Sequence, residues 1–256
     1  MPYSGRERKA GSLSMMHSRR WVVARAVAAA SLFACLGIVS AAAQQMDAAS
    51  VIQLVDAAVK ARIDHIAAYS VTEHYAVYRG KDETHPAAEM TVRTEYKAET
   101  GKSYTILSQS GSGLIHKYVL APLLDNEKTI NLPGNRERSW FTSANYEMKL
   151  KSGVVERLDE RDCLALAIVP KRKATNMIEG TLWVDAKDGS IVRIEGTASQ
   201  SVSVFTEPAH VMRQYVNIDG YSMATHARAT SDSFLLGRTT VTIDYRDYQI
   251  KLRPAK

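Results

Sequence analysis

The sequence predicts an α+β protein that is mainly antiparallel β, with one large, strongly curved sheet and helices against its concave side. In the second half of the chain, strand-like segments follow one another with only short turns between them, which argues against an alternating parallel α/β fold. Apolar and polar residues alternate in these strands, so one face of the sheet is apolar. Beyond residue 43 only two segments have helical periodicity, and they are the segments available to cover that face.

The first 43 residues have the three parts of a Sec-type secretory signal peptide behind an N-terminal extension. Arg19, Arg20 and Arg25 form its positive segment, residues 26–39 form an apolar stretch, and alanines 41–43 supply an A-x-A cleavage site. The stretch is shorter than the about 20 apolar residues of a membrane-spanning helix. We therefore expect export to the periplasm and a single domain over residues 44–256. The alternative is a membrane-anchored lipoprotein attached through Cys35.

Charge and cysteine content restrict the partners of this domain. The formal net charge of the chain is +6, but the first 43 residues hold six of the 33 basic and one of the 27 acidic residues. The remainder, with 27 basic and 26 acidic residues, lacks the basic excess that a phosphate backbone selects, so we expect no nucleic-acid partner. Cys163 is its one thiol and begins an apolar strand. We interpret it as a buried residue without a chemical role that forms no internal disulfide. Separately, we expect the domain to be a monomer.

Helical and strand periodicities set the expected elements. Residues 46–66 have helical spacing with Asp47 as a candidate N-cap, and residues 114–127 look helical, with Pro122 expected to kink that helix or start a second one. Residues 110–113 read as a flexible joint, and residues 156–162 as a solvated turn. The expected strands lie at 71–79, 89–98, 103–108, 163–169, 180–185, 191–198, 211–218, 223–229 and 238–252.

The apolar face of this sheet is the candidate ligand site. Its members alternate with polar residues such as Arg193, Glu195 and Asp244, which fall on the opposite face. The candidate cleft residues are Leu164, Leu166, Ile168, Leu182, Val184, Val192, Ile194, Val241 and Ile243. Aromatic side chains are a second possible lining, with packing on the scaffold as the equal alternative: Trp183, Tyr69, Tyr75, Tyr78, Tyr215, Tyr221, Tyr245 and Tyr248.

No pattern in the sequence supports catalysis, a metal or a cofactor. Residues 101–103 (Gly-Lys-Ser) resemble the end of a phosphate-binding loop, but Tyr96 stands where that loop requires its first glycine. The histidines beyond residue 43 are never two or four positions apart, as a local zinc site would require. We therefore predict no catalytic residues, no metal ligands and no cofactor.

A segment of roughly forty residues carries a resemblance to a known family. It runs from Arg161 to Lys171, continues with the Leu-Trp-Val-Asp hairpin strand at 182–185, and ends at Glu195. With the order of signal, helix, three strands, helical insertion and meander, it resembles the bacterial lipoprotein-carrier superfamily of LolA, LolB and RseB-like proteins. The resemblance implies an incomplete, highly curved barrel whose apolar concave face accepts acyl chains under helices.

Three functions from different classes follow. The first is a periplasmic lipoprotein-sorting-like protein that binds acyl chains of lipoproteins or lipids without catalysis. The alternative is an RseB-like envelope sensor or adaptor, which binds a protein partner on the same scaffold. The third is a hydrolase on a β scaffold, for which the sequence offers no triad or metal spacing.

Overall fold

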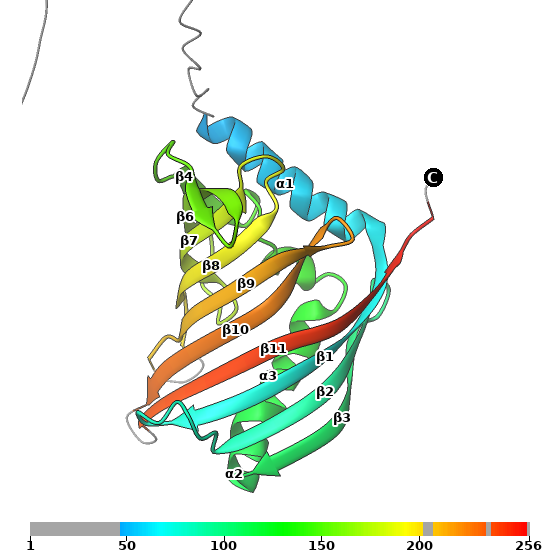
Figure 1. Ribbon diagram of the computed structural model, residues 1–256, viewed down its shortest axis with the longest axis vertical. Coiled ribbons are helices and arrows are strands. Elements are labelled where there is room, and N and C mark those ends of the chain that lie inside the picture. The colour runs from blue at the N-terminus through cyan, green and yellow to red at the C-terminus, as the bar shows by residue number, and fades with distance from the viewer. Residues whose placement is uncertain (1–46, 202–206, 234–236, 255–256) are drawn as a thin grey trace, which may run out of the picture. The chain divides into compact units, whose positions relative to one another are not determined.

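The computed structural model describes residues 47–201, 207–233 and 237–254 (Figure 1). The expected signal peptide and Cys35 lie outside these residues. The described chain forms one open sheet of eleven antiparallel strands with a few helices, which confirms the predicted fold class. The strands are β1 Ile66–Arg79, β2 Ala88–Lys97, β3 Gly101–Gly111, β4 Tyr146–Leu150, β5 Glu156–Leu158, β6 Arg161–Pro170, β7 Ile178–Asp185, β8 Ile191–Ala198, β9 His210–Ile218, β10 Tyr221–Ser233 and β11 Gly237–Leu252.

The order of the strands joins two meanders into one sheet. It runs β3-β2-β1-β11-β10-β9-β8-β7-β6-β4, with β5 paired to β6 beside β4. The first and last strands therefore lie side by side, with Glu73 opposite Tyr245 and Val77 opposite Val241. Sequence periodicity gave no indication of this pairing. Within the described residues, β3 forms one edge of the sheet, and β4 and β5 together form the other.

Helix α1 (Ala48–His65) begins where the sequence predicts. The Asp47 carboxylate accepts hydrogen bonds from the backbone N–H groups of Ala49 and Ser50, at 2.9 and 3.0 Å, and so satisfies two donors that a helix start leaves unpaired. The helix passes directly into β1, without a loop. It is also attached to the chain before β4, because the Asp56 carboxylate accepts from the backbone N–H of Ser143 at 2.8 Å.

The second helical segment is broken as Pro122 predicts. A short α2 (Gly113–Ile115) leads into a π-helical turn η1 (His116–Leu120) and then α3 (Ala121–Asn131). The N–H of Ala121 donates to the carbonyl of His116, five residues back, and Pro122 has no N–H to continue the ordinary ladder. A 3₁₀ turn, η2 (Arg136–Ser139), follows the loop after α3.

Two short segments differ from the sequence interpretation. Residues 110 and 111 belong to β3, and Gly113 already starts α2, so the predicted joint is only one residue long. Gly111 has φ +86°, and a Cβ there would lie 2.5 Å from the carbonyl oxygen of Ala87, so this glycine permits a close backbone approach. The predicted turn at 156–162 contains β5, and only Asp159 and Glu160 make the tight turn, both with positive φ.

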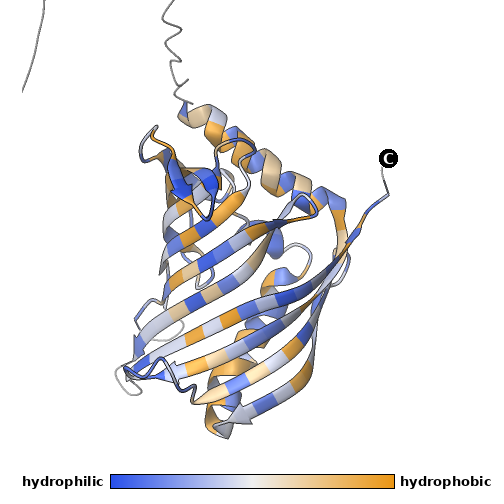
Figure 2. Cartoon of the chain, in the orientation of Figure 1, coloured by the Kyte–Doolittle hydropathy of each residue, from blue (hydrophilic) through white to orange (hydrophobic). Residues whose placement is uncertain are grey.

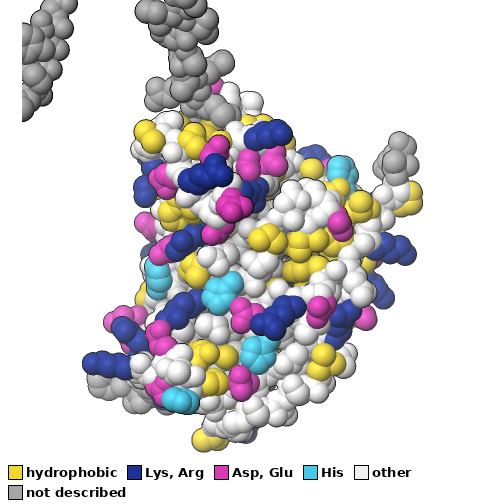
Figure 3. Space-filling view, in the orientation of Figure 1, with side chains coloured by type: hydrophobic (Ala, Val, Ile, Leu, Met, Phe, Trp, Pro, Cys, Tyr) yellow, Lys and Arg dark blue, Asp and Glu magenta, His cyan; other side chains and the backbone are white. Residues whose placement is uncertain are grey.

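Hydrophobic and hydrophilic residues alternate along many of the strands (Figure 2), and the buried apolar residues gather into clusters. Helices α1 and α3 lie on the inner side of the curve (Figure 1), over two apolar clusters. The outer face carries charged groups and histidines (Figure 3), including the ion pair of Arg193 with Glu195 at 2.6 Å. No helix in the described part of the chain is long and apolar enough to cross a membrane.

Candidate functional site

Most of the predicted cleft residues lie under α1. Six of them form one buried cluster together with Val51 and Val55 of that helix, and each is at most 2 % exposed: Leu164, Leu166, Ile168, Leu182, Val184 and Ile194. Val192 is equally buried but is not part of this cluster, because the register of β7 and β8 shifts between Trp183 and Val184. In this region the inner face is filled by side chains of the protein itself.

The remaining two predicted residues lie elsewhere on the inner face. Val241 and Ile243 of β11 are partly buried and pack against a second apolar cluster, under α2, η1 and α3. The strands contribute its floor, and the helical segment contributes Ile115, Leu120 and Leu124. The buried floor residues of β1 and β2 are Tyr75, Val77, Ala88, Met90 and Val92. The structure thus divides the predicted continuous cleft into two separately covered apolar clusters.

A buried polar group borders the second cluster. Glu73 of β1 is only 1 % exposed and accepts a hydrogen bond from the hydroxyl of Tyr75, while its other carboxylate oxygen has no partner within the described residues. Tyr104 of β3 likewise has a buried hydroxyl with no such partner. Burial raises the pKa of Tyr104 and of Tyr245, so both phenols stay protonated. Unsatisfied buried groups on a ligand-facing surface are potential contacts for a polar ligand group or water.

An ion pair connects α3 to β3 at the same place. Lys102 Nζ lies 2.9 Å from Glu127 Oε2, and their side chains are 12 % and 26 % exposed. Burial is the largest single effect and opposes both charges, but the mutual attraction together with other nearby polar groups outweighs it, so the pKa of Lys102 is raised and that of Glu127 is lowered. The nearby charge of Arg213 on β9 lowers the pKa of Glu127 further. Lys102 and Glu127 therefore stay charged over a wide pH range and fasten the helix to the edge strand.

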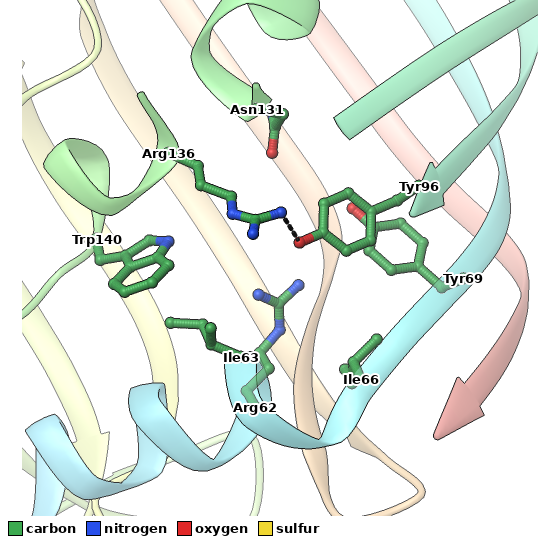
Figure 4. Close-up of a pocket in the computed structure, with 8 residues that line it drawn as sticks. All are labelled: Arg62, Ile63, Ile66, Tyr69, Tyr96, Asn131, Arg136 and Trp140. Atoms are coloured by element: carbon green, nitrogen blue, oxygen red, sulfur yellow. Dashed lines mark hydrogen bonds between the residues drawn. The ribbon is translucent and has the colours of Figure 1, made fainter. Parts of the chain in front are cut away.

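A small cavity lies between the ends of α1 and α3. Its volume is about 50 Å³, and Figure 4 shows the guanidinium groups of Arg62 and Arg136 pointing into it. Tyr96 stacks on Tyr69 with ring centroids 4.8 Å apart, and its hydroxyl accepts a hydrogen bond from Arg136 Nη1 at 2.9 Å. The cavity is lined by Arg62, Ile63, Ile66, Tyr69, Tyr96, Asn131, Arg136 and Trp140. None of these residues is acidic.

The sequence predicted neither the cavity nor most of the buried polar side chains beside the second cluster. Arg62, Tyr96 and the pair Arg136 and Trp140 come from three separate segments, α1, β2 and the turn η2, so no local spacing predicts their meeting. Glu73 did carry a signal, because it shares the phase of Val71, Tyr75 and Val77, which all point inward. Tyr69, Tyr75 and Tyr245 of the possible aromatic lining do lie on the inner side. Trp183 instead donates to Glu156 at 2.9 Å.

Possible metal ligands and the Cys163 thiol can be located within the described residues. No three His, Cys, Asp or Glu side chains there lie close enough together to hold a metal ion. Cys163 is buried, with its sulfur 3.5 Å from the carbonyl oxygen of Arg161. Burial raises the pKa of this thiol, which is the opposite of what a catalytic thiolate requires.

Comparison with known proteins identifies related folds. No protein-family model matches the sequence, and no curated protein matches it. Among solved structures, the chain is similar to a domain from Vibrio parahaemolyticus described as an outer membrane lipoprotein-sorting protein, with TM-score 0.47 and 12% identity over 82% of this chain and 95% of that chain. A LolA superfamily protein from Nitrosomonas europaea gives TM-score 0.42 and 12% identity over 82% and 96% of the two chains. A DUF1329 family protein from Desulfovibrio piger gives 0.39 and 12% over 79% and 92%. The descriptions of the first two, lipoprotein sorting and LolA, are names that also occur in the family that the sequence resembles.

Proposed function

We propose that this chain is a periplasmic protein that binds the acyl chains of lipoproteins or lipids on the inner face of its sheet, beneath α2, η1 and α3, and catalyses no reaction. One observation carries the proposal: the helical segment over the second apolar cluster is irregular and is anchored by three buried apolar side chains, those of Ile115, Leu120 and Leu124. An acyl chain can therefore replace these three side chains on the apolar cluster while the sheet stays folded.

The magnitudes favour this exchange. Re-exposing three aliphatic side chains costs about 1.5–3 kcal/mol each, roughly 5–9 kcal/mol together. Displacing α3 also breaks its ion pair with Lys102, which adds about 2–3 kcal/mol. Burying an acyl chain contributes about 0.8 kcal/mol per methylene, so about 15 buried methylenes contribute roughly 12 kcal/mol. A long acyl chain therefore offsets the displacement of the helix, whereas a short chain does not.

The cover over the first cluster is less suited to move. Helix α1 continues directly into β1, and its backbone at Leu54 is so close to Gly189 that a Cβ there would lie 2.5 Å away. The end of α3 also lies close to the sheet, since a Cβ at Gly101 would lie 2.8 Å from the carbonyl oxygen of Asn131. The difference is in the connections: α2 follows the glycine-containing end of β3, and α3 leads into the loop at 132–135 rather than directly into a strand. The six predicted cleft residues under α1 are then core residues, whereas Val241 and Ile243 contact the acyl chain.

The test is titration with a fluorescent long-chain fatty acid. Val241→Thr keeps the shape of the side chain but places a hydroxyl against the acyl chain, so we expect the affinity to fall by about tenfold. The matched control is Val216→Thr on the exposed part of β9, where Val216 is 43 % exposed, and it should bind like the wild type. A protein that binds no fatty acid, or a Val241→Thr variant with unchanged affinity, would refute the proposal.

A sensor or adaptor that binds an envelope protein is the second candidate. It is favoured by β3, an edge strand that carries the exposed side chains of Ile106 and Leu107 at 52 % and 57 % exposure. An edge strand offers unpaired backbone groups to a partner strand. Ile106→Lys should then abolish a stoichiometric protein complex captured by crosslinking in the envelope and leave fatty-acid binding intact. A complex that is unaffected by this substitution would exclude the edge strand as the docking site.

A further inference from the structure

The cavity between α1 and α3 contains two cations but no acidic lining residue. Arg136 is held in place from outside it: Nη1 donates to the carbonyl oxygen of Ala98 at 2.6 Å, and Nε donates to Glu137 at 3.1 Å. Arg62 differs, because its buried Nε has no hydrogen-bond partner within the described residues. Two guanidinium groups directed into one small space repel each other unless an anion lies between them.

The other polar groups of the cavity complete a site for an oxyanion. The hydroxyl of Tyr96 accepts from Arg136, so its own hydrogen is available to a ligand, and burial raises the pKa of this phenol. The amide nitrogen of Asn131 donates to the carbonyl oxygen of Glu127 at 2.8 Å, and Figure 4 shows its oxygen directed into the cavity as an acceptor. Donors from Arg62 and Tyr96 with one acceptor match an anion that keeps one hydroxyl, as a phosphate monoester or hydrogen phosphate does.

The volume of the cavity and the residues around it also fit a phosphate group. A cavity of about 50 Å³ holds a group of phosphate size and little more. The side chain of Ile63 and the indole of Trp140 form its apolar wall, which limits hydration and strengthens charge-assisted hydrogen bonds. In the described part of the chain Arg136 forms an ion pair with Glu137 and Arg62 forms none, so one positive charge of the lining is left uncompensated.

We propose that this cavity binds a phosphate group, either free or at the head of a lipid, between Arg62, Arg136 and the hydroxyl of Tyr96. The site does not depend on acyl binding under α3, since inorganic phosphate needs no acyl chain to enter it. It extends the function from holding a hydrocarbon to recognising a charged group at a separate place on the inner face.

The experiment is calorimetric titration of the full chain with two probes, inorganic phosphate and dihexanoyl phosphatidic acid. Arg62→Gln should weaken phosphate binding by on the order of tenfold, which corresponds to about 1.4 kcal/mol. The matched control is Lys60→Gln, which removes the same charge from the same helix at a side chain that is 74 % exposed. It should bind like the wild type. Tyr96→Phe removes only the hydroxyl and should weaken binding several-fold, which keeps the test valid if Arg62→Gln does not fold.

Each outcome has a defined meaning. Arg62-dependent binding of inorganic phosphate supports the proposal with a free anion as ligand. Arg62-dependent binding of the lipid alone supports it with the headgroup as the source. If neither probe binds, or if the wild type and Arg62→Gln bind equally, the phosphate site is refuted. Fatty-acid binding that persists in that case would leave the acyl-binding proposal standing.

Discussion

Glu127→Gln tests whether the ion pair to Lys102 holds α3 on the sheet. Breaking a buried ion pair by removing one partner costs about 3–5 kcal/mol, because the other charge stays buried alone. The side chain of Glu127 is 26 % exposed, so water compensates part of that loss. We therefore expect the free energy of unfolding to fall by about 2–3 kcal/mol. Urea denaturation followed by circular dichroism measures it.

The consequence should be local as well as global. If the ion pair fastens α3, amide hydrogens of residues 121–131 should exchange faster in Glu127→Gln, and a fluorescent fatty acid should associate faster. Asp125→Asn is the matched control, since it makes the same chemical change at an exposed position of the same helix. Loss of less than about 1 kcal/mol, together with unchanged exchange in α3, would contradict the role given to the pair.

The dependence on pH follows from the directions of the two pKa shifts. The lowered pKa of Glu127 gives a stabilisation that is present above its usual value of 4.5 and is lost as pH falls through the folded value. The raised pKa of Lys102 gives a stabilisation that is complete below 10.5 and is lost as pH rises through the folded value. The difference in unfolding free energy between wild type and Glu127→Gln should therefore be largest between these limits and shrink in acid.

Two further predictions concern the scaffold. Gly180→Ala would place a Cβ 2.2 Å from the carbonyl oxygen of Glu195 on the neighbouring strand, so we expect a loss of about 3 kcal/mol or more in unfolding free energy by urea titration. Gly113→Ala, which meets no atom within 4 Å, should change it little. Cys163 should react with a disulfide reagent far more slowly in the native protein than in guanidinium, because it is buried with a raised pKa. Equal rates would show that β6 does not protect it.

The alternation in sequence predicted the faces of the strands because it depends on local backbone geometry alone. Leu164, Leu166 and Leu182 all lie on the apolar side where the period of two places them. Val192 is the exception among the predicted residues of β8. Val192 leaves the cluster because one irregularity in the pairing of β7 and β8 shifts the phase of the strand, and such an irregularity has no fixed sequence signature.

Strand partners and the division of the inner face were not predictable in the same way. The pairing of β1 with β11 joins residues about as far apart in the chain as the described part allows. The alternation of apolar and polar residues in a strand does not depend on which strand it pairs with, so it cannot predict the partner. Whether helices fill the face depends on where α1 and α3 cross the sheet. That crossing is set by tertiary contacts such as Asp56 to Ser143 and Lys102 to Glu127.

Helix α3 links the two proposed sites, since Leu124 lies over the apolar cluster and Asn131 lines the cavity. The two positions are seven residues apart, or about 10 Å along the helix. A movement of α3 that admits an acyl chain should therefore also withdraw the acceptor oxygen of Asn131 from the phosphate site.

Thermodynamic linkage requires the effect of each ligand on the affinity for the other to be reciprocal. A long-chain alcohol, which has no phosphate, should weaken the binding of inorganic phosphate, and phosphate should weaken the binding of the alcohol by the same factor. Calorimetric titration of each ligand in the presence of the other measures both factors. Affinities that do not change would show that α3 stays in place when the hydrocarbon binds, and the acyl chain would then need another entrance.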